Sequence, residues 1–185
     1  MKKMKFFLLI FITIGVFFIS NQYFQNNKYN FNLNSEKGLL SLKDFAGKKL
    51  IVYFGYTYCP DVCPTELALI GDVLTKINAK NAHVLFISLD PNRDNNITQT
   101  NQWVKYFYPN STALVAKNEN ELQNITKNYG VIYEKIPLPN SAMQYSIAHS
   151  GEFYLLDENG KFVKKISDIS YENFYNEIKK FLNEK

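Results

Sequence analysis

The sequence has few of the side chains that usually bind metals or react, and it has no clustered charge. Its 185 residues include two cysteines and two histidines. The net charge is +4, and the lysines are scattered rather than gathered into a basic block or an arginine-rich stripe. Nucleic acid is therefore not an expected partner. The composition, 46% hydrophobic and 21% charged, is that of a globular protein.

The chain shows no internal repeat, and its length allows one well-packed domain with an appendage. We divide it into an N-terminal membrane anchor or signal segment at residues 1–20, a polar tether at 21–30 and a folded domain at 31–185. The tether is rich in Asn, Gln, Lys and Tyr, which suits a solvated linker between a membrane and a domain.

The N-terminal segment lacks a cleavage site of small residues and a cysteine that could carry a lipid. Lys2, Lys3 and Lys5 precede an uncharged run from Phe6 to Ile19. As a helix this run would cover about 21 Å, short of the roughly 30 Å hydrocarbon core, and this length alone favours a signal peptide. Because no cleavage site follows, we favour an uncleaved anchor in a bacterial inner membrane, with the domain in the periplasm or outside the cell membrane.

Two apolar runs of strand length enclose the cysteines. The first, KKLIVYFGY (residues 48–56), is apolar at nearly every position and predicts a central strand that is buried on both faces. After the cysteines, apolar residues at helical spacing predict an amphipathic helix from Pro64 to about Asn78, with Cys63 at its N-cap. The second run, HVLFISLD (residues 83–90), completes a strand–helix–strand unit with a right-handed parallel crossover.

The remaining pattern predicts the other elements of a thioredoxin-like α/β sandwich. We expect helices at residues 97–108 and 119–128 around a short strand at 112–116, then a hairpin of two alternating strands around Asn159-Gly160, and a C-terminal helix. The segment before His149 contains two prolines and is expected to be irregular. Residues 31–42 add an N-terminal β-hairpin, so the predicted fold is a three-layer α/β sandwich preceded by an anchor helix.

Cys59 and Cys63 stand in the stretch YFGYTYCPDVCPTEL, and a proline follows each of them. The pair could be a structural disulfide, a redox pair or part of a metal site. A disulfide that closes so short a loop removes little entropy from the unfolded chain, which disfavours a purely structural role. The N-terminus of the following helix favours a thiolate, so we expect Cys63 to ionise more easily than an ordinary cysteine.

A metal site would need a third ligand besides the two thiolates, which favour Cu(I) or Zn(II). His83 opens an apolar strand, where a structural role is expected. His149 precedes a strand whose entry loop faces the cysteine motif in a thioredoxin-like fold. Cys59, Cys63 and His149 would suit Cu(I) and tolerate Cu(II) with a further oxygen ligand, whereas a structural zinc site would need a fourth residue.

Three stretches, in this order and spacing, closely resemble the Sco/SenC family of copper-binding, thioredoxin-like proteins that assist assembly of cytochrome c oxidase. They are YFGYTYCPDVCPTEL, FISLDPNRD (residues 86–94) and IAHSGEFYLLDENGK (residues 147–161). The resemblance covers the chain from about residue 31 to its end.

The resemblance implies that Cys59, Cys63 and His149 are the copper ligands. It also implies that the cysteines, which form a Cys59–Cys63 disulfide when oxidised, must be reduced before Cu(I) is loaded. Asp61 and Asp90 match family positions near the site and would support it. Many relatives carry an acidic residue immediately before the histidine, where this sequence has an alanine, so no carboxylate assistance is expected from that position.

The implied function is that of a membrane-anchored copper chaperone rather than an enzyme. Copper would pass from a periplasmic donor to a cytochrome c oxidase subunit, after a thiol reductant has reduced the cysteines. The alternative is an anchored thiol–disulfide oxidoreductase that reduces an oxidase subunit or another exported protein, with Cys59 and Cys63 as its redox-active pair. Oxidoreductases of this fold normally have a proline immediately before the strand that faces the cysteines, where this chain has Ser146 to His149. A thiol peroxidase would share the fold but not the CPDVCP motif.

Overall fold

The computed structural model describes residues 27–184 together with Gly15, Val16, Ile19 and Gln22. None of the helices within these residues has the length and hydropathy of a membrane-spanning segment. Most of the expected anchor at residues 1–20, and part of the tether at 21–30, lie outside the described residues. The anchor and the tether therefore stay predictions.

Five strands form a central sheet in the spatial order β5–β4–β3–β8–β9. Their bounds are β3 (Lys49–Gly55), β4 (Ala82–Ser88), β5 (Ser111–Leu114), β8 (Phe153–Leu156) and β9 (Phe162–Ile166). The first three run parallel to one another, and β8 and β9 pair antiparallel with their neighbours. The predicted strand–helix–strand unit is confirmed, because β3 and β4 pair in parallel and α2 (Val62–Ile77) connects them.

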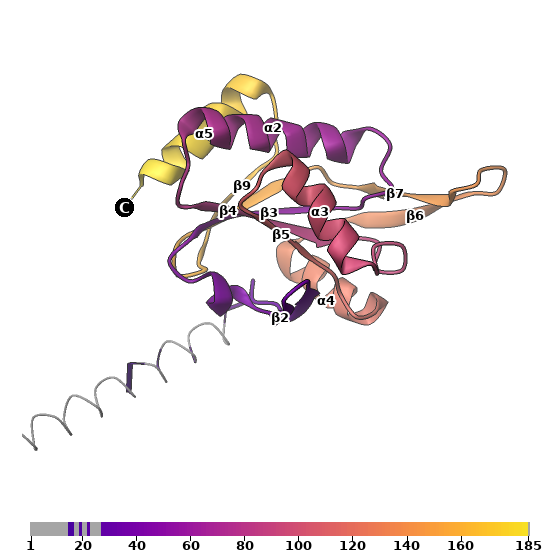
Figure 1. Ribbon diagram of the computed structural model, residues 1–185, viewed down its shortest axis with the longest axis horizontal. Helices are drawn as coiled ribbons and strands as arrows, with labels where there is room; N and C mark the ends of the chain where they lie inside the picture. The colour runs from indigo at the N-terminus through magenta and orange to yellow at the C-terminus, as the bar shows by residue number, and fades with distance from the viewer. Residues whose placement is uncertain (1–14, 17–18, 20–21, 23–26, 185) are drawn as a thin grey trace, which may run out of the picture.

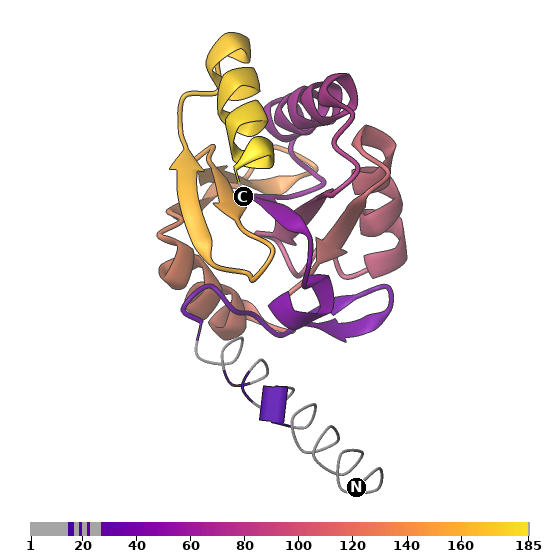
Figure 2. The same ribbon diagram turned by 90° about the vertical axis from the view of Figure 1, so that its left-hand side faces the viewer.

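Helices cover both faces of the sheet (Figures 1 and 2). Helix α2 and helix α5 (Tyr171–Asn183) lie side by side on one face, and α3 (Ile97–Phe107) packs against α2 and β5. On the other face lie α4 (Glu119–Tyr129) and the N-terminal hairpin of β1 (Leu33–Ser35) and β2 (Gly38–Leu40), which a short 3-10 helix, Leu42–Phe45, follows. The predicted α/β sandwich with an N-terminal hairpin is confirmed, with element ends that differ by one or two residues.

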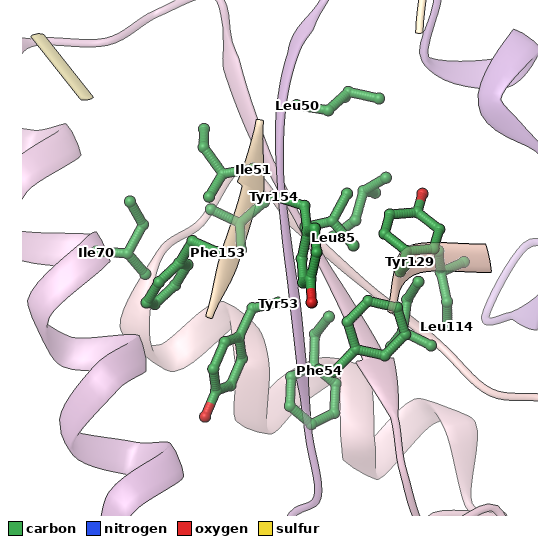
Figure 3. Close-up of a cluster of buried hydrophobic side chains, with 14 of the residues drawn as sticks. Leu50, Ile51, Tyr53, Phe54, Ile70, Leu85, Leu114, Tyr129, Phe153 and Tyr154 are labelled. Carbon is green, nitrogen blue, oxygen red and sulfur yellow. The ribbon is translucent and has the colours of Figure 1, made fainter. Parts of the chain in front are cut away.

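Strand β3 is buried at every position, because strands pair with both of its edges and helices cover both of its faces. Its successive side chains enter two different aromatic clusters (Figure 3). On the α2 and α5 side, Tyr53 stacks on Phe153 with 5.0 Å between ring centroids, and Phe153 contacts Phe174 of α5 at 4.8 Å. On the opposite side, Phe54 meets Tyr129 of α4 at 5.1 Å.

The segment before His149 is a β-hairpin, so the prediction of an irregular segment is wrong. Strands β6 (Tyr133–Leu138) and β7 (Gln144–His149) form a separate two-stranded sheet that projects from the domain (Figure 1). Pro137 lies within β6, opposite Tyr145. A proline lacks the N–H donor that a central strand needs, but each strand of a two-stranded sheet has one unpaired edge where this loss is tolerated.

The hairpin around Asn159-Gly160 is confirmed, but only one of its strands alternates between buried and exposed residues. The outer strand β9 alternates along most of its length, whereas β8 is buried at all four of its positions. The reason is the position of β8 between β3 and β9 inside the sheet. A strand covered on both faces has no solvent-facing side for polar residues.

Gly71 lies where α2 packs against the end of α3. A Cβ atom at this position would lie 2.2 Å from the backbone oxygen of Phe107, which cannot rotate away. We expect Gly71→Ala to lower the free energy of unfolding by about 1–3 kcal/mol, despite the better helix propensity of alanine. Urea unfolding of the reduced protein measures this change.

Thr75→Ala is the control, because Thr75 is an exposed position of the same helix. Its effect should stay within about 0.5 kcal/mol. A Gly71→Ala variant as stable as the parent protein would contradict the close approach of α2 to α3.

Candidate functional site

Cys63 lies inside the first turn of α2, so the prediction that it occupies the N-cap is wrong. The helix begins at Val62, and Asp61 is its N-cap residue. Pro64 then occupies the third helical position rather than the first. A proline is tolerated there because the N–H groups of the first helical turn have no partner within the helix.

Cys59 lies in the loop between β3 and α2 and is half-buried. Its Sγ accepts a hydrogen bond from the backbone N–H of Cys63 at 3.3 Å. The Asp61 side chain makes no capping hydrogen bond. The Cys59 sulfur thus takes the place of a capping oxygen at the start of α2, which holds the two cysteines side by side. Both are free thiols.

The thiol of Cys63 is completely buried. Burial raises its pKa to about 12, although the nearby Tyr53 hydroxyl and the Tyr56 backbone act in the opposite direction. The expectation that Cys63 ionises more easily than an ordinary cysteine is therefore wrong. The helix N-terminus does favour a thiolate, but the loss of water around the sulfur outweighs that effect.

His149 is the last residue of β7, and it faces Cys63 across the end of the sheet. Its Nε2 lies 3.5 Å from the Cys63 Sγ, between residues that are 86 positions apart in the chain. Its Nδ1 lies 3.1 Å from the Ser150 carbonyl oxygen. If Nδ1 carries the proton and donates it to this carbonyl, the lone pair of Nε2 points toward the sulfur.

Two tyrosine rings lie beside the imidazole, those of Tyr53 and Tyr56, in edge-to-face arrangements with centroid separations of 6.4 and 6.3 Å. The Tyr56 hydroxyl also accepts a hydrogen bond from the Ile147 backbone N–H at 3.2 Å, two residues before His149. Tyr53, near the end of β3, and Tyr56, directly after it, thus contact the histidine ring, and Tyr56 also binds the strand that carries it.

Glu66 and Tyr53 lie on the buried side of this site, where neither was expected from the sequence. Glu66 follows Cys63 by one helical turn and is only 4% exposed. Its Oε2 and the Tyr53 hydroxyl are buried and have no hydrogen-bond partner of normal geometry among the described residues. Burial raises the pKa of the Glu66 carboxyl, and the Tyr53 hydroxyl and the charge of His149 lower it in part.

The structure brings Cys63 and His149 into contact and places Cys59 beside Cys63. Among the described residues, however, no group of three His, Cys, Asp or Glu side chains is arranged closely enough to hold a metal ion. The two thiols and the imidazole nonetheless lie close together at the C-terminal end of β3, through the Cys59–Cys63 and Cys63–His149 contacts. A set of two sulfurs and one nitrogen is suited to a soft metal ion or to thiol chemistry.

The two aspartates that were expected near the site have different positions. Asp61 is exposed, between the cysteines. Asp90 is completely buried and forms an ion pair with Arg93. The Tyr145 hydroxyl donates to its carboxylate, at 2.8 Å from Oδ1.

The second histidine, His83, lies in β4 away from the cysteines. Its Nε2 lies 2.9 Å from the Thr112 hydroxyl, and its ring packs against Phe45 with 5.3 Å between centroids. Burial lowers its pKa to about 4. These contacts agree with the structural role that its position at the start of a strand predicts.

A family model described as SCO1/SenC matches residues 20–183 of the chain. The chain belongs to the SCO1/SenC family. Among SCO relatives, the SCO2-like protein of Rickettsia felis is 32% identical over 138 residues, which are 73% of this chain and 66% of that protein. The mitochondrial SCO1 homolog 1 of Arabidopsis thaliana is 37% identical over 126 residues, which are 66% of this chain and 36% of that protein. The chain therefore spans about two thirds or less of the length of these relatives.

Solved structures of SCO proteins have the same fold. Arabidopsis thaliana ScoI with copper bound superposes with a TM-score of 0.75 at 30% identity, over 83% of this chain and 96% of that one. Bradyrhizobium japonicum ScoI with copper bound gives a TM-score of 0.68 at 31% identity, over 82% and 97% of the two chains. The predicted thioredoxin-like fold is thus confirmed.

The burial of Cys63 predicts slow alkylation in the native protein. In a Cys59→Ser variant, iodoacetamide at about pH 7.5 should modify Cys63 at least ~10-fold more slowly in the native than in the urea-unfolded state, because a thiol with a pKa of about 12 holds far less thiolate than a free cysteine. The native rate should keep rising with pH beyond about 10, where the rate of an unfolded thiol approaches its plateau. The half-buried Cys59, measured in a Cys63→Ser variant, should react faster. Equal native and unfolded rates for Cys63 would contradict the buried thiol.

Proposed function

We propose that this protein binds one copper ion through Cys59, Cys63 and His149 and delivers it during assembly of cytochrome c oxidase. The observation that carries the proposal is the 3.5 Å approach of His149 Nε2 to Cys63 Sγ. Copper is present in the solved ScoI structures of Arabidopsis thaliana and Bradyrhizobium japonicum, which share this fold at 30% and 31% identity.

The chemistry of the donor set supports copper as the cargo. Two thiolates and one imidazole suit trigonal Cu(I), and they tolerate Cu(II) when an additional oxygen ligand is present. A structural zinc site would take a fourth protein ligand. Among the described residues, no three His, Cys, Asp or Glu side chains lie close enough together to hold a metal ion. Copper loading therefore requires Cys59, Cys63 and His149 to move closer together.

Copper loading is coupled to the release of protons. Each thiol gives up its proton when its sulfur binds Cu(I). Because the pKa of Cys63 is raised to about 12, this thiol is protonated at neutral pH, and copper must displace the proton. Copper affinity should therefore rise with pH across the neutral range.

Copper transfer needs a partner to reach the ligands, and the cysteine loop is the accessible side of the site. Tyr58 and Val62, which flank Cys59 and Cys63, are each 51% exposed. An acceptor subunit could replace the ligands one at a time with its own cysteines or histidines. Cys59, the more exposed sulfur, would be displaced first, and the buried Cys63 would hold the ion longest.

Oxidation of both thiols to a Cys59–Cys63 disulfide would remove two of the three ligands, so a thiol reductant must supply two electrons before copper enters. The alternative function, a general thiol–disulfide oxidoreductase, is less consistent with the sequence before the strand that faces the cysteines, where such enzymes normally have a proline and this chain has Ser146 to His149. We further propose that residues 1–20 anchor the protein in a bacterial inner membrane, with residues 31–185 in the periplasm or outside the cell membrane, where a copper donor would meet it.

An anaerobic Cu(I) titration of the reduced protein tests the proposed ligands. One tight equivalent should bind, and His149→Ala should weaken binding by about 10-fold or more, because the imidazole nitrogen no longer contributes a third bond to the ion. Oxidation to the disulfide should abolish tight binding.

His83→Ala is the matched control, because it removes the other histidine, which contacts Thr112 and not the cysteines. It should leave Cu(I) affinity unchanged. Unchanged affinity in His149→Ala would contradict the three-ligand site, and no tight copper together with rapid reduction of a test disulfide would favour the oxidoreductase.

A further inference from the structure

The strand that carries His149 is not part of the central sheet. Strands β6 and β7 pair only with each other in the described part of the chain, and the hairpin projects from the domain (Figure 1). No strand pairing therefore joins β7 to the part of the sheet that carries the cysteines. Residues 150–152 link His149 to β8, and side-chain contacts between the hairpin and the rest of the domain must fix the rest of its position.

Arg93, from the loop after β4, makes the most extensive of these contacts. Its guanidinium Nη1 donates to the backbone carbonyl of Tyr145, at the start of β7, at 3.2 Å and to that of Met143, just before β7, at 3.4 Å. Its Cζ lies 3.8 Å from the centroid of the Tyr145 ring. The buried carboxylate of Asp90 pairs with the Arg93 Nε and also accepts from the Tyr145 hydroxyl at 2.8 Å. Backbone hydrogen bonds, a stacking contact with Tyr145 and an ion pair with Asp90 thus connect Arg93 to β7.

The same guanidinium faces the loop that leads to the cysteines. Its Cζ lies 5.0 Å from the ring centroid of Tyr58, the residue before Cys59, and 5.6 Å from that of Tyr56. Tyr56 in turn accepts the Ile147 N–H, two residues before His149. Arg93 therefore contacts both chain segments that supply the proposed ligands.

An arginine is chemically suited to this junction. A planar guanidinium can pair with a carboxylate, donate to carbonyls in its own plane and stack on aromatic rings at the same time, which the compact ammonium of lysine cannot do. The Arg93 side chain is 15% exposed and the Asp90 side chain is fully buried, so solvent screens their interaction little.

We propose that Arg93 is a positioning residue that sets the separation between the His149 ring and the Cys63 thiol by clamping strand β7 to the cysteine loop. The proposal rests on the proposed function, in which His149 and the two cysteines share a copper ion. Arg93 itself does not touch the ion. By fixing the hairpin, Arg93 determines how much the His149 imidazole adds to Cu(I) affinity without a rearrangement of the hairpin.

The test is a double-mutant cycle on Cu(I) affinity with Arg93→Gln, His149→Ala and the combination of both. Arg93→Gln alone should weaken Cu(I) binding by about 10–100-fold, as residues that orient a metal ligand commonly do. In the His149→Ala background the same change should have no further effect, because the group that Arg93 positions is gone. Arg93→Lys should recover only part of the loss, since lysine keeps the charge but not the planar contacts.

Two further variants control for effects of charge and folding. Lys105→Gln removes one positive charge at an exposed position whose charged neighbour is Glu36, and it should leave Cu(I) affinity unchanged. If Arg93→Gln fails to fold, Asp90→Asn with Arg93→Gln avoids leaving a buried carboxylate unpaired and is expected to lose affinity to the same degree.

Amide hydrogen exchange of the copper-free protein gives a readout that does not depend on the proposed ligands. In Arg93→Gln, the Ile147 amide should exchange faster while the amides of β3 keep their rates. Unchanged Cu(I) affinity in Arg93→Gln, an equal loss in the His149→Ala background, or an unchanged Ile147 amide would each overturn the proposal. If His149→Ala alone leaves affinity unchanged, the three-ligand function fails, and the Ile147 amide alone then decides whether Arg93 clamps the strand.

Discussion

Strand β3 is paired on both edges and covered on both faces, and the position of its C-terminal end determines where the site can form. The cysteine loop leaves this end directly. Because β4 is parallel to β3, the loop after β4 begins at the same end of the sheet as the cysteine loop. Hydrogen bonds connect the two loops close to the strand ends. The Leu89 N–H donates to the Gly55 carbonyl at 2.7 Å, and the Thr57 N–H donates to the buried Asp94 at 3.3 Å. The loop that holds Asp90 and Arg93 thus lies next to the cysteine loop because β3 and β4 are parallel neighbours.

The environment of Cys63 illustrates a competition between two physical effects. A helix N-terminus stabilises a nearby negative charge by roughly 0.3–2 kcal/mol. The rise of the Cys63 pKa from 9.0 to about 12 corresponds to about 4 kcal/mol against the thiolate. Burial is therefore the larger effect in the metal-free protein. A buried, protonated thiol is protected from oxidants and alkylating agents, whereas a bound cation would supply the compensating charge that water does not.

Much of the fold followed from hydrophobic patterning, because the buried central strands are long apolar runs and the helices show clear periodicity. The cysteine pair and His149 could also be selected from the sequence, since few other soft ligands exist in the chain. The burial of Cys63 could not, because it depends on how α2 packs. Glu66 was detectable in principle: it lies on the same helical stripe as Cys63, Leu67 and Ile70, where a charged residue is unexpected. The hairpin β6–β7 was missed because proline signals a break in a central strand but not in a two-stranded sheet.

In the copper site that we propose, two sulfurs and one imidazole nitrogen hold the same ion. X-ray absorption spectroscopy of the reduced, Cu(I)-loaded protein can identify these ligands, because sulfur and imidazole ligands scatter differently. We expect a three-coordinate ion with two sulfur ligands and one imidazole, whose multiple-scattering signal disappears in His149→Ala. A spectrum with sulfur ligands alone, or a copper–copper distance from an ion cluster shared between chains, would contradict it.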